Sequence, residues 1–258
     1  MDLKINKLKS TVAFFAISPV VGFLKPLFVS ILDGQAQFGN YTLVIAYSVW
    51  FSYVINSGIY EGLLKRYAQF FEEDKKDKIN TLNNKISSFW LLLLVVFTLC
   101  ISFFAAISSF YFFSAGLLLS FSTVSFNVYS AKYRVLSNIF RISFIQLLRL
   151  TISLLITYTL ILNTNFGLDI ILFIDALVLC FISILIFLPS FVSTFSFKRF
   201  TKDYFEIAFT ARNLTYVSAL RALCLVLERQ IASFLFEDIV FSQYAQILLL
   251  FQAMIVGF

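Results

Sequence analysis

The sequence predicts an all-α polytopic membrane protein with about eight transmembrane helices. Of its 258 residues, 60% are hydrophobic and 13% are charged, whereas soluble globular domains carry about 25% charged residues. The chain contains only three prolines, and a run such as Trp90 to Ile101 is apolar on every face, without the alternation of a barrel strand. These runs therefore favour long helices, which satisfy their backbone hydrogen bonds internally as lipid requires.

Eight apolar segments are long enough to cross the hydrocarbon core, which takes about 20 helical residues. The first follows a basic start, MDLKINKLK, and resembles a signal peptide. Its apolar stretch is too long for one and lacks a small-residue cleavage motif, so we expect a retained span. The spans are expected near residues 11–32, 38–60, 86–106, 108–129, 143–163, 168–190, 213–235 and 241–258.

The connections between these spans differ in charge. Basic residues occupy the N-terminus and the second, fourth and sixth connections, of which the second is the charged stretch FFEEDKKDKINTLNNK, expected to be a solvated connector. The other connections lack basic residues and carry Asp33, Asp169, Glu237 and Asp238. By the positive-inside rule, the N-terminus and the even-numbered connections are predicted to be cytoplasmic.

A weak repeat relates the first outward hairpin to the last. A shift of 203 positions aligns Ser30, Leu32, Phe38 and Tyr41 with Ser233, Leu235, Phe241 and Tyr244. Six spans separate the two hairpins, as in a parallel repeat of six-helix bundles, although Phe and Tyr are also common at any membrane interface. We predict a first bundle of six spans over residues 1–200 and the first two spans of a second bundle over residues 201–258. Because the chain stops within an apolar run, we expect a fragment or a truncated product.

Several ionisable residues fall inside the predicted spans, where such residues indicate function by default. The basic ones are Lys25, Arg149, Arg221 and Arg229, and the acidic ones are Asp175 and Glu228. Arg149 lies near a cytoplasmic end, where snorkelling to the headgroups is the simple explanation. Lys25 has the same alternative. Asp175 is expected to pair with Lys25 or Arg221, to act as a protonatable coupling group, or to lie near the interface.

The seventh span contains Arg221, Glu228 and Arg229, whose cost of insertion, about +7.5 to +10.5 kcal/mol, exceeds the gain from its apolar residues. This span must face protein or water. Arg221 and Glu228 share one helical face, so we expect either an internal bridge between Glu228 and an arginine or a hydrated, charged lumen.

Two prolines lie in the first span, Pro19 and Pro26, on the same face and next to Lys25. Proline removes a helix hydrogen bond, and irregular backbone at membrane depth occurs where it lines a cavity or is buried in protein. We therefore predict a helix break there. Under the 203-residue shift Lys25 falls on Glu228, so a charged position recurs in both repeats.

The sequence argues against several other classes of protein. It has no histidine, and its three cysteines are isolated within apolar runs, so neither a metal site, a disulfide framework nor a bound cofactor is expected. The net charge of +6 suggests nucleic acid, but the basic residues are spread over short connections and are better explained as topology signals.

Four features of the sequence carry a resemblance to a known family: FGNY with its echo FSQY, NSGIYEGLLKRYA, KYRVLSNIFRISFIQLLRLTISLLITY and LERQIASFLFEDIVFSQYA. With these motifs, the overall arrangement resembles the Wzx-type polysaccharide flippases of the multidrug/oligosaccharidyl-lipid/polysaccharide exporter superfamily. This resemblance implies a two-bundle transporter that carries a polyprenyl-diphosphate-linked oligosaccharide across the bacterial inner membrane, with polysaccharide polymerase machinery as a further partner. Lys25, Arg221 and Arg229 would then bind the diphosphate, and Asp175 and Glu228 would tune them or bind a coupling ion.

Three alternatives remain open at this stage. A multidrug exporter of the same superfamily would need acidic cavity residues and aromatic walls. A membrane polymerase or acyltransferase would need a positioned general base or a sizeable outward loop, which this sequence does not offer, so an enzyme is not expected. A truncated remnant that transports nothing is the third.

Overall fold

The computed structural model describes residues 17, 20–22, 24–31, 35–191 and 197–256, and no strand occurs among them. Residues 20–22 and 24–31 are helical. They are followed by α2 (Gln35–Asn56), α3 (Ile59–Glu72), α4 (Lys76–Ser108), α5 (Tyr111–Val135), α6 (Ile139–Asn163), α7 (Leu168–Phe191), α8 (Phe197–Leu235) and α9 (Asp238–Val256).

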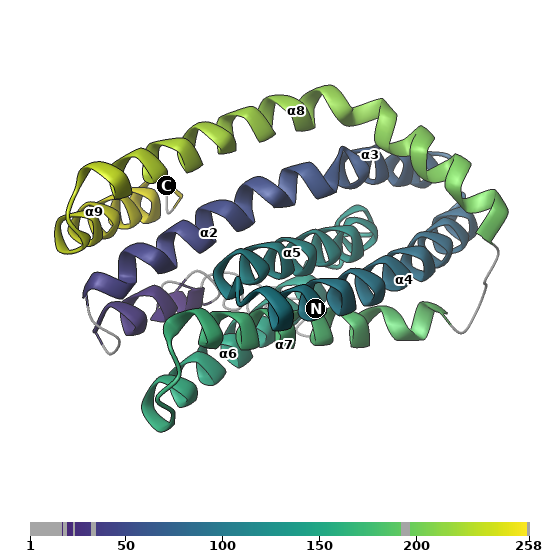
Figure 1. The fold of residues 1–258 in the computed structure, drawn as a ribbon. Helices are drawn as coiled ribbons and strands as arrows, with labels where there is room; N and C mark the ends of the chain where they lie inside the picture. The colour runs from purple at the N-terminus through teal and green to yellow at the C-terminus, as the bar shows by residue number, and fades with distance from the viewer. Residues whose placement is uncertain (1–16, 18–19, 23, 32–34, 192–196, 257–258) are drawn as a thin grey trace, which may run out of the picture.

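The helices form a long bundle whose turns gather at its two ends (Figure 1). The α4–α5, α6–α7 and α8–α9 turns belong to one end, which we call the acidic end because Asp169, Glu237 and Asp238 lie there. The α3–α4 and α5–α6 turns belong to the other, called the basic end. Helix α5 lies in the middle and packs against α2, α3, α4 and α7.

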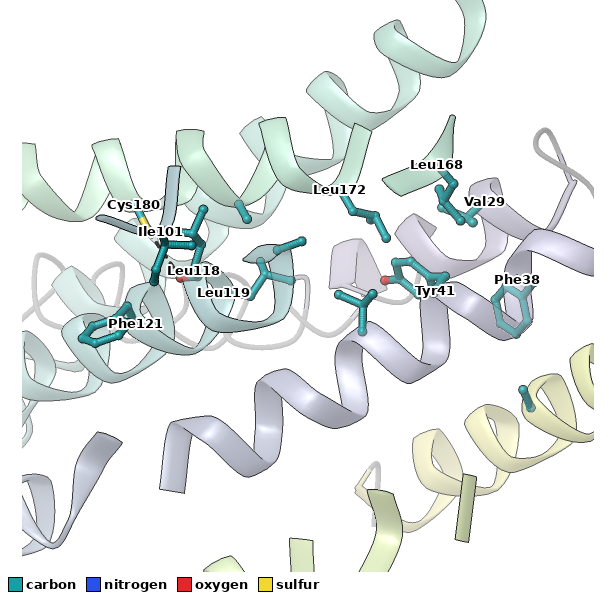
Figure 2. Close-up of a cluster of buried hydrophobic side chains, with 14 of the residues drawn as sticks. Val29, Phe38, Tyr41, Ile101, Leu118, Leu119, Phe121, Leu168, Leu172 and Cys180 are labelled. Carbon is teal, nitrogen blue, oxygen red and sulfur yellow. Dashed lines mark hydrogen bonds between the residues drawn. The ribbon is translucent and has the colours of Figure 1, made fainter. Parts of the chain in front are cut away.

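The core contains two clusters of buried apolar side chains. Toward the acidic end, one cluster of buried side chains includes Phe38 and Tyr41 of α2, Leu118 of α5 and Leu172 of α7 (Figure 2). Near the basic end, a second cluster surrounds Trp90 of α4, whose indole Nε1 donates to Ser125 Oγ at 2.7 Å. Because the buried indole N–H has an acceptor, this large side chain is accommodated without an unpaired polar group.

Five helices, α2, α4, α5, α6 and α7, are long and apolar enough to cross a membrane, among the residues that the structure describes. The predicted all-α polytopic fold is confirmed by these helices. Their outward faces carry large apolar side chains, for example Leu99, Phe103 and Ile107 of α4, which are 66–70% exposed. Such a surface fits lipid and would be costly in water.

The predicted span over residues 38–60 is wrong at its end, because the chain bends between α2 and α3. Ser57 and Gly58 adopt positive φ angles of 42° and 88°, a conformation that glycine adopts without steric cost. The side-chain oxygen of Asn56 accepts from the Tyr60 amide at 3.0 Å and its amide donates to Glu61. The bend turns the short helix α3 along the basic end of the bundle.

The stretch FFEEDKKDKINTLNNK is mostly exposed, as predicted for a solvated connector, but only residues 73–75 of it lie outside helices. Tyr67 of α3 and Ile79 of α4 are fully buried. Packing between these amphipathic segments therefore stabilises both helices, which the mixed charges of the sequence did not predict. Helix α8 similarly begins at Phe197, well before the predicted residue 213. At about 1.5 Å per residue it is nearly twice as long as the hydrocarbon core is thick.

Candidate functional site

A buried ion pair joins the first span to α7. The Lys25 ammonium donates to the carboxylate of Asp175 and to Ser153 Oγ of α6, the latter at 2.8 Å. The Asp175 side chain is fully buried and that of Lys25 is 12% exposed. Asp175 lies seven residues into α7, about 10 Å along the helix, so the pair sits within the apolar part of the bundle. Of the three expectations for Asp175, the structure shows the pairing with Lys25.

One oxygen of this carboxylate, Asp175 Oδ1, is buried and has no hydrogen-bond partner among the described residues. An ionised carboxylate in an apolar interior depends on its partners to offset the loss of hydration. The described contacts of the pair are the bond between Lys25 and Asp175 and the bond from Lys25 to Ser153. Few contacts therefore hold the pair in place. The pair thus depends on the position of the first span.

Arg149 does not snorkel, which corrects the expectation from the sequence. It is 8% exposed, and its Nη2 donates to the Oγ and the carbonyl oxygen of Ser122 on α5 at 2.6 and 3.1 Å. Its guanidinium also lies over the ring of Phe126, 4.7 Å from the centroid. The neighbouring helix thus supplies acceptors and an aromatic face, which replace the headgroups as partners for the charge.

Arg149 of α6 and Asp175 of α7 lie near further buried polar residues of their own helices. On α6, Arg149, Ser153 and Thr157 recur every four residues and are all buried. On α7, Ser183 lies two turns beyond Asp175, and its Oγ is 3.2 Å from Ser122 Oγ. Sequence reasoning missed this polar layer, although the four-residue spacing of Arg149, Ser153 and Thr157 was a signal for it.

The charges of α8 have separate environments. Arg229 is 8% exposed and its Nη1 donates to the carbonyl oxygen of Thr42 on α2 at 2.8 Å. Glu228 accepts a hydrogen bond from the Tyr244 hydroxyl of α9, so the described contact of this carboxylate is with a tyrosine and not the predicted bridge to an arginine. Arg221 and Glu228 are exposed on the same side of α8. The structure therefore brings Lys25 and Asp175 together but keeps the α8 residues apart from them.

The predicted helix break is only partly within the described chain. Pro26 is buried in a segment that is helical from residue 24 to residue 31, so the helix continues through it. Pro19 lies outside the described residues.

The start of α2 touches the start of α9 at positions that the 203-residue shift makes equivalent. The Gly39 amide donates to Ser242 Oγ at 3.1 Å, and a Cβ on Gly39 would come within 2.5 Å of the Phe241 ring. Helix α9 also begins at Asp238, which is the shifted counterpart of Gln35 at the start of α2. A residue meets its own counterpart where an approximate two-fold axis passes between two copies.

An aromatic pocket of about 370 Å³ opens at the acidic end between α2, the α4–α5 turn, α7 and α8. We call it the acidic-end pocket. Its walls include Tyr47, Tyr111 and Phe113, and its polar groups include Asp169 and Gln230. The Tyr47 hydroxyl donates to Gln230 Oε1, which ties α2 to α8 at the pocket.

Comparisons with protein-family models, with curated proteins and with solved structures find no match for this chain.

The described residues hold no cluster of carboxylates, cysteines or histidines with the geometry of a metal site. Charged and polar groups nevertheless occur at four places in the apolar bundle. They are the Lys25–Asp175 pair, the buried polar residues around Arg149, the arginines of α8 and the acidic-end pocket. Chemically, these groups supply hydrogen-bond donors, acceptors and charges within the bundle.

Proposed function

We propose that this protein is a membrane transporter, and that it moves a polyprenyl-diphosphate-linked oligosaccharide across the bacterial inner membrane. The observation that carries the proposal is the buried Lys25–Asp175 pair within a bundle of apolar helices. Ionisable groups at membrane depth are costly and are associated with solute pathways and ion coupling. The identity of the solute is drawn from the resemblance of the sequence to Wzx-type flippases.

The contact between Gly39 and Ser242 supports a two-repeat architecture. In a parallel repeat, the α8–α9 hairpin is the counterpart of the first span and α2, and the solute site lies between the two bundles. Two crossed contacts fit this arrangement: Arg229 of α8 bonds α2, and Gln246 of α9 donates to Ser30 of the first span at 2.6 Å.

The role proposed for the basic residues changes with the structure. Lys25 is neutralised by Asp175 and Arg229 is bonded to the backbone of α2, so neither is a ready donor for a diphosphate. Exposed Arg221 keeps that role, with Glu228, two helical turns away on the same side of α8, as a tuning group. We propose that Lys25, Asp175 and Arg229 instead couple helix movement to transport, because their contacts join the first span and α8 to α6, α7 and α2.

The test uses the whole protein in cells whose surface polysaccharide depends on it. Lys25→Met combined with Asp175→Leu replaces both charged groups by apolar side chains of similar shape, a change that buried pairs often tolerate. We expect normal abundance in the membrane and no surface polysaccharide, and the same result for Arg221→Ala. Lys76→Ala, at an exposed position, is the matched control. Normal polysaccharide from both variants would overturn the proposal.

A multidrug exporter is the second candidate, and the acidic-end pocket favours it. Asp169 and several aromatic rings line this pocket, and no basic residue is among its lining residues, which suits an organic cation through ionic and cation–π attraction. Ethidium efflux that Asp169→Asn abolishes would establish this function. Equal ethidium accumulation with and without the protein would remove it.

A further inference from the structure

A second pocket, of about 270 Å³, lies at the basic end between α3, the start of α4 and the start of α8. We call it the α3–α4 pocket. Three basic side chains line it, together with one hydroxyl, one aromatic ring and one carboxylate: Arg66, Lys78, Lys85, Thr81, Phe70 and Glu206. Three positive charges and one negative charge leave a net of two positive charges at the pocket.

The three basic groups of the α3–α4 pocket form no ion pair with any residue that the structure describes. The adjacent lysines behave differently: Lys75 pairs with Glu73 at 2.5 Å and Lys76 with Asp74 at 3.5 Å. The hydrogen bond from Lys75 holds the pKa of the Glu73 carboxyl below its ordinary value. The carboxylates of the turn are thus occupied by lysines outside the pocket, and its own cations are left available for a ligand.

The backbone arranges these cations around one volume. Lys78, Thr81 and Lys85 recur at intervals of three and four residues and therefore share one face of α4. From α3, the Arg66 guanidinium lies 5.1 Å from the centroid of Phe70, and the Lys78 ammonium lies 6.0 Å from the same centroid. Two like charges near one ring repel each other, so an anion between them would be stabilised from both helices.

The α3–α4 pocket lies where α3 and α8 are in close contact. Gly62 of α3 lies so close to α8 that a Cβ would overlap the carbonyl oxygen of Ile207, and Ile207 itself lines the pocket. This backbone contact places α3 and the start of α8 side by side at the pocket.

The depth of the pocket identifies the environment of its ligand. Lys85 is the last charged residue of α4 before the apolar stretch that begins at Ile86. Helix α4 has 33 residues, about 50 Å, which exceeds the hydrocarbon core of about 30 Å. The turns that carry Lys78, Thr81 and Lys85 therefore lie at the level of the lipid headgroups.

We propose that the α3–α4 pocket binds the phosphate group of a lipid headgroup. Lysine and arginine recognise phosphate through charge-assisted hydrogen bonds, and basic pockets between helices at the membrane surface suit anionic headgroups. The inference does not rest on the proposed function, because a phospholipid would occupy this pocket in a protein that transports nothing. A bulk acidic phospholipid and a polyprenyl diphosphate share the required chemistry.

The test measures lipid binding to the purified full chain in detergent by native mass spectrometry, without any transport assay. The probes are phosphatidylglycerol, a polyprenyl diphosphate, inorganic diphosphate and diacylglycerol. We expect saturable binding of a phosphate-bearing lipid and none of diacylglycerol. Combining Arg66→Gln, Lys78→Gln and Lys85→Gln should raise the dissociation constant about five-fold for each charge removed, or about one hundred-fold in total.

The matched control combines Lys75→Gln with Lys76→Gln, which removes two lysines of the same turn that do not line the pocket. Its dissociation constant should stay within two-fold of the parent, and Lys85→Arg should retain binding. Tighter binding of the polyprenyl diphosphate would identify it as the natural occupant, and equal binding of phosphatidylglycerol would identify bulk lipid. The proposal fails if no phosphate-bearing lipid binds, or if the triple variant and the control bind alike.

Discussion

Asp175 and Lys25 illustrate how a single charged residue depends on its partner. Asp175 is fully buried and its described ionic partner is Lys25. Removing one member of a buried pair leaves the other charge unpaired in an apolar interior, at a cost of about 3–5 kcal/mol. Removing both avoids that cost.

We therefore predict that Asp175→Leu and Lys25→Met each lower the midpoint of thermal unfolding in detergent, and that the double variant regains most of the loss. The measurement is tryptophan fluorescence of the purified chain on heating. Additive losses in the double variant would show that the two residues do not act as a pair.

Arg149 shows the same dependence on polar neighbours. Its guanidinium donates to Ser122 and is nearly enclosed. We predict that Ser122→Ala destabilises the protein by about 1.5–3 kcal/mol, the contribution of a hydrogen bond to a charged group. The matched control is Ser102→Ala on α4, whose hydroxyl donates only to the Thr98 carbonyl of its own helix. Equal losses from the two changes would contradict the importance of the Arg149 contact.

At the scale of helices, the contact between α3 and α8 depends on the absence of side chains. Both Gly58 and Gly62 face the backbone of α8, and a Cβ on Gly58 would lie 2.6 Å from the Ala208 carbonyl oxygen. Glycine allows the two backbones to approach closely, as small residues do between helices in membranes. The positive φ of Gly58 adds a second requirement for glycine.

We predict that Gly62→Ala destabilises the protein by about 1–3 kcal/mol through overpacking. Gly116→Ala is the matched control, because its Cβ would have 3.4 Å to the nearest atom, on Tyr47. The control should be neutral or slightly stabilising, since alanine favours the helix. The measurement is the midpoint of thermal unfolding of both variants. An unchanged midpoint for Gly62→Ala would show that α8 can move away from α3.

For the whole molecule, the prediction concerns its orientation in the membrane. The basic end is predicted to be cytoplasmic by the positive-inside rule. A cysteine at Asn165, in the α6–α7 turn of the acidic end, should react with an impermeant maleimide added outside intact cells. A cysteine at Lys76, at the basic end, should react only after the membrane is permeabilised. The reverse pattern would invert the topology.

These substitutions are made in a background without the native thiols, of which Cys100 and Cys224 are exposed and Cys180 is buried. The buried Cys180 thiol donates to the Leu118 carbonyl, so serine is the suitable replacement there because it keeps a donor. Protein abundance in this background is the control for folding.

The sequence by itself determined the class of fold and the positions of most apolar helices. Runs that are apolar on every face have only one favourable backbone structure in lipid, so α4 to α7 could be placed without tertiary information. The sequence also identified the charged residues within the membrane spans, since Lys25 and Asp175 stand inside long apolar runs. Their pairing was one of several possibilities, because residues 150 positions apart carry no local signal of contact.

Only the tertiary structure decided which charges are paired and where the amphipathic segments become helical. Arg149 is held by Ser122, and Arg229 by the backbone of α2, contacts that depend on how neighbouring helices are rotated. Likewise, α3 and the start of α8 are stabilised by packing at Gly62 and Ile207. Their mixed charges are typical of a loop, and these segments become stable helices because a neighbouring helix covers their apolar face. The α3–α4 pocket arises from that packing, because three separate helices supply its walls.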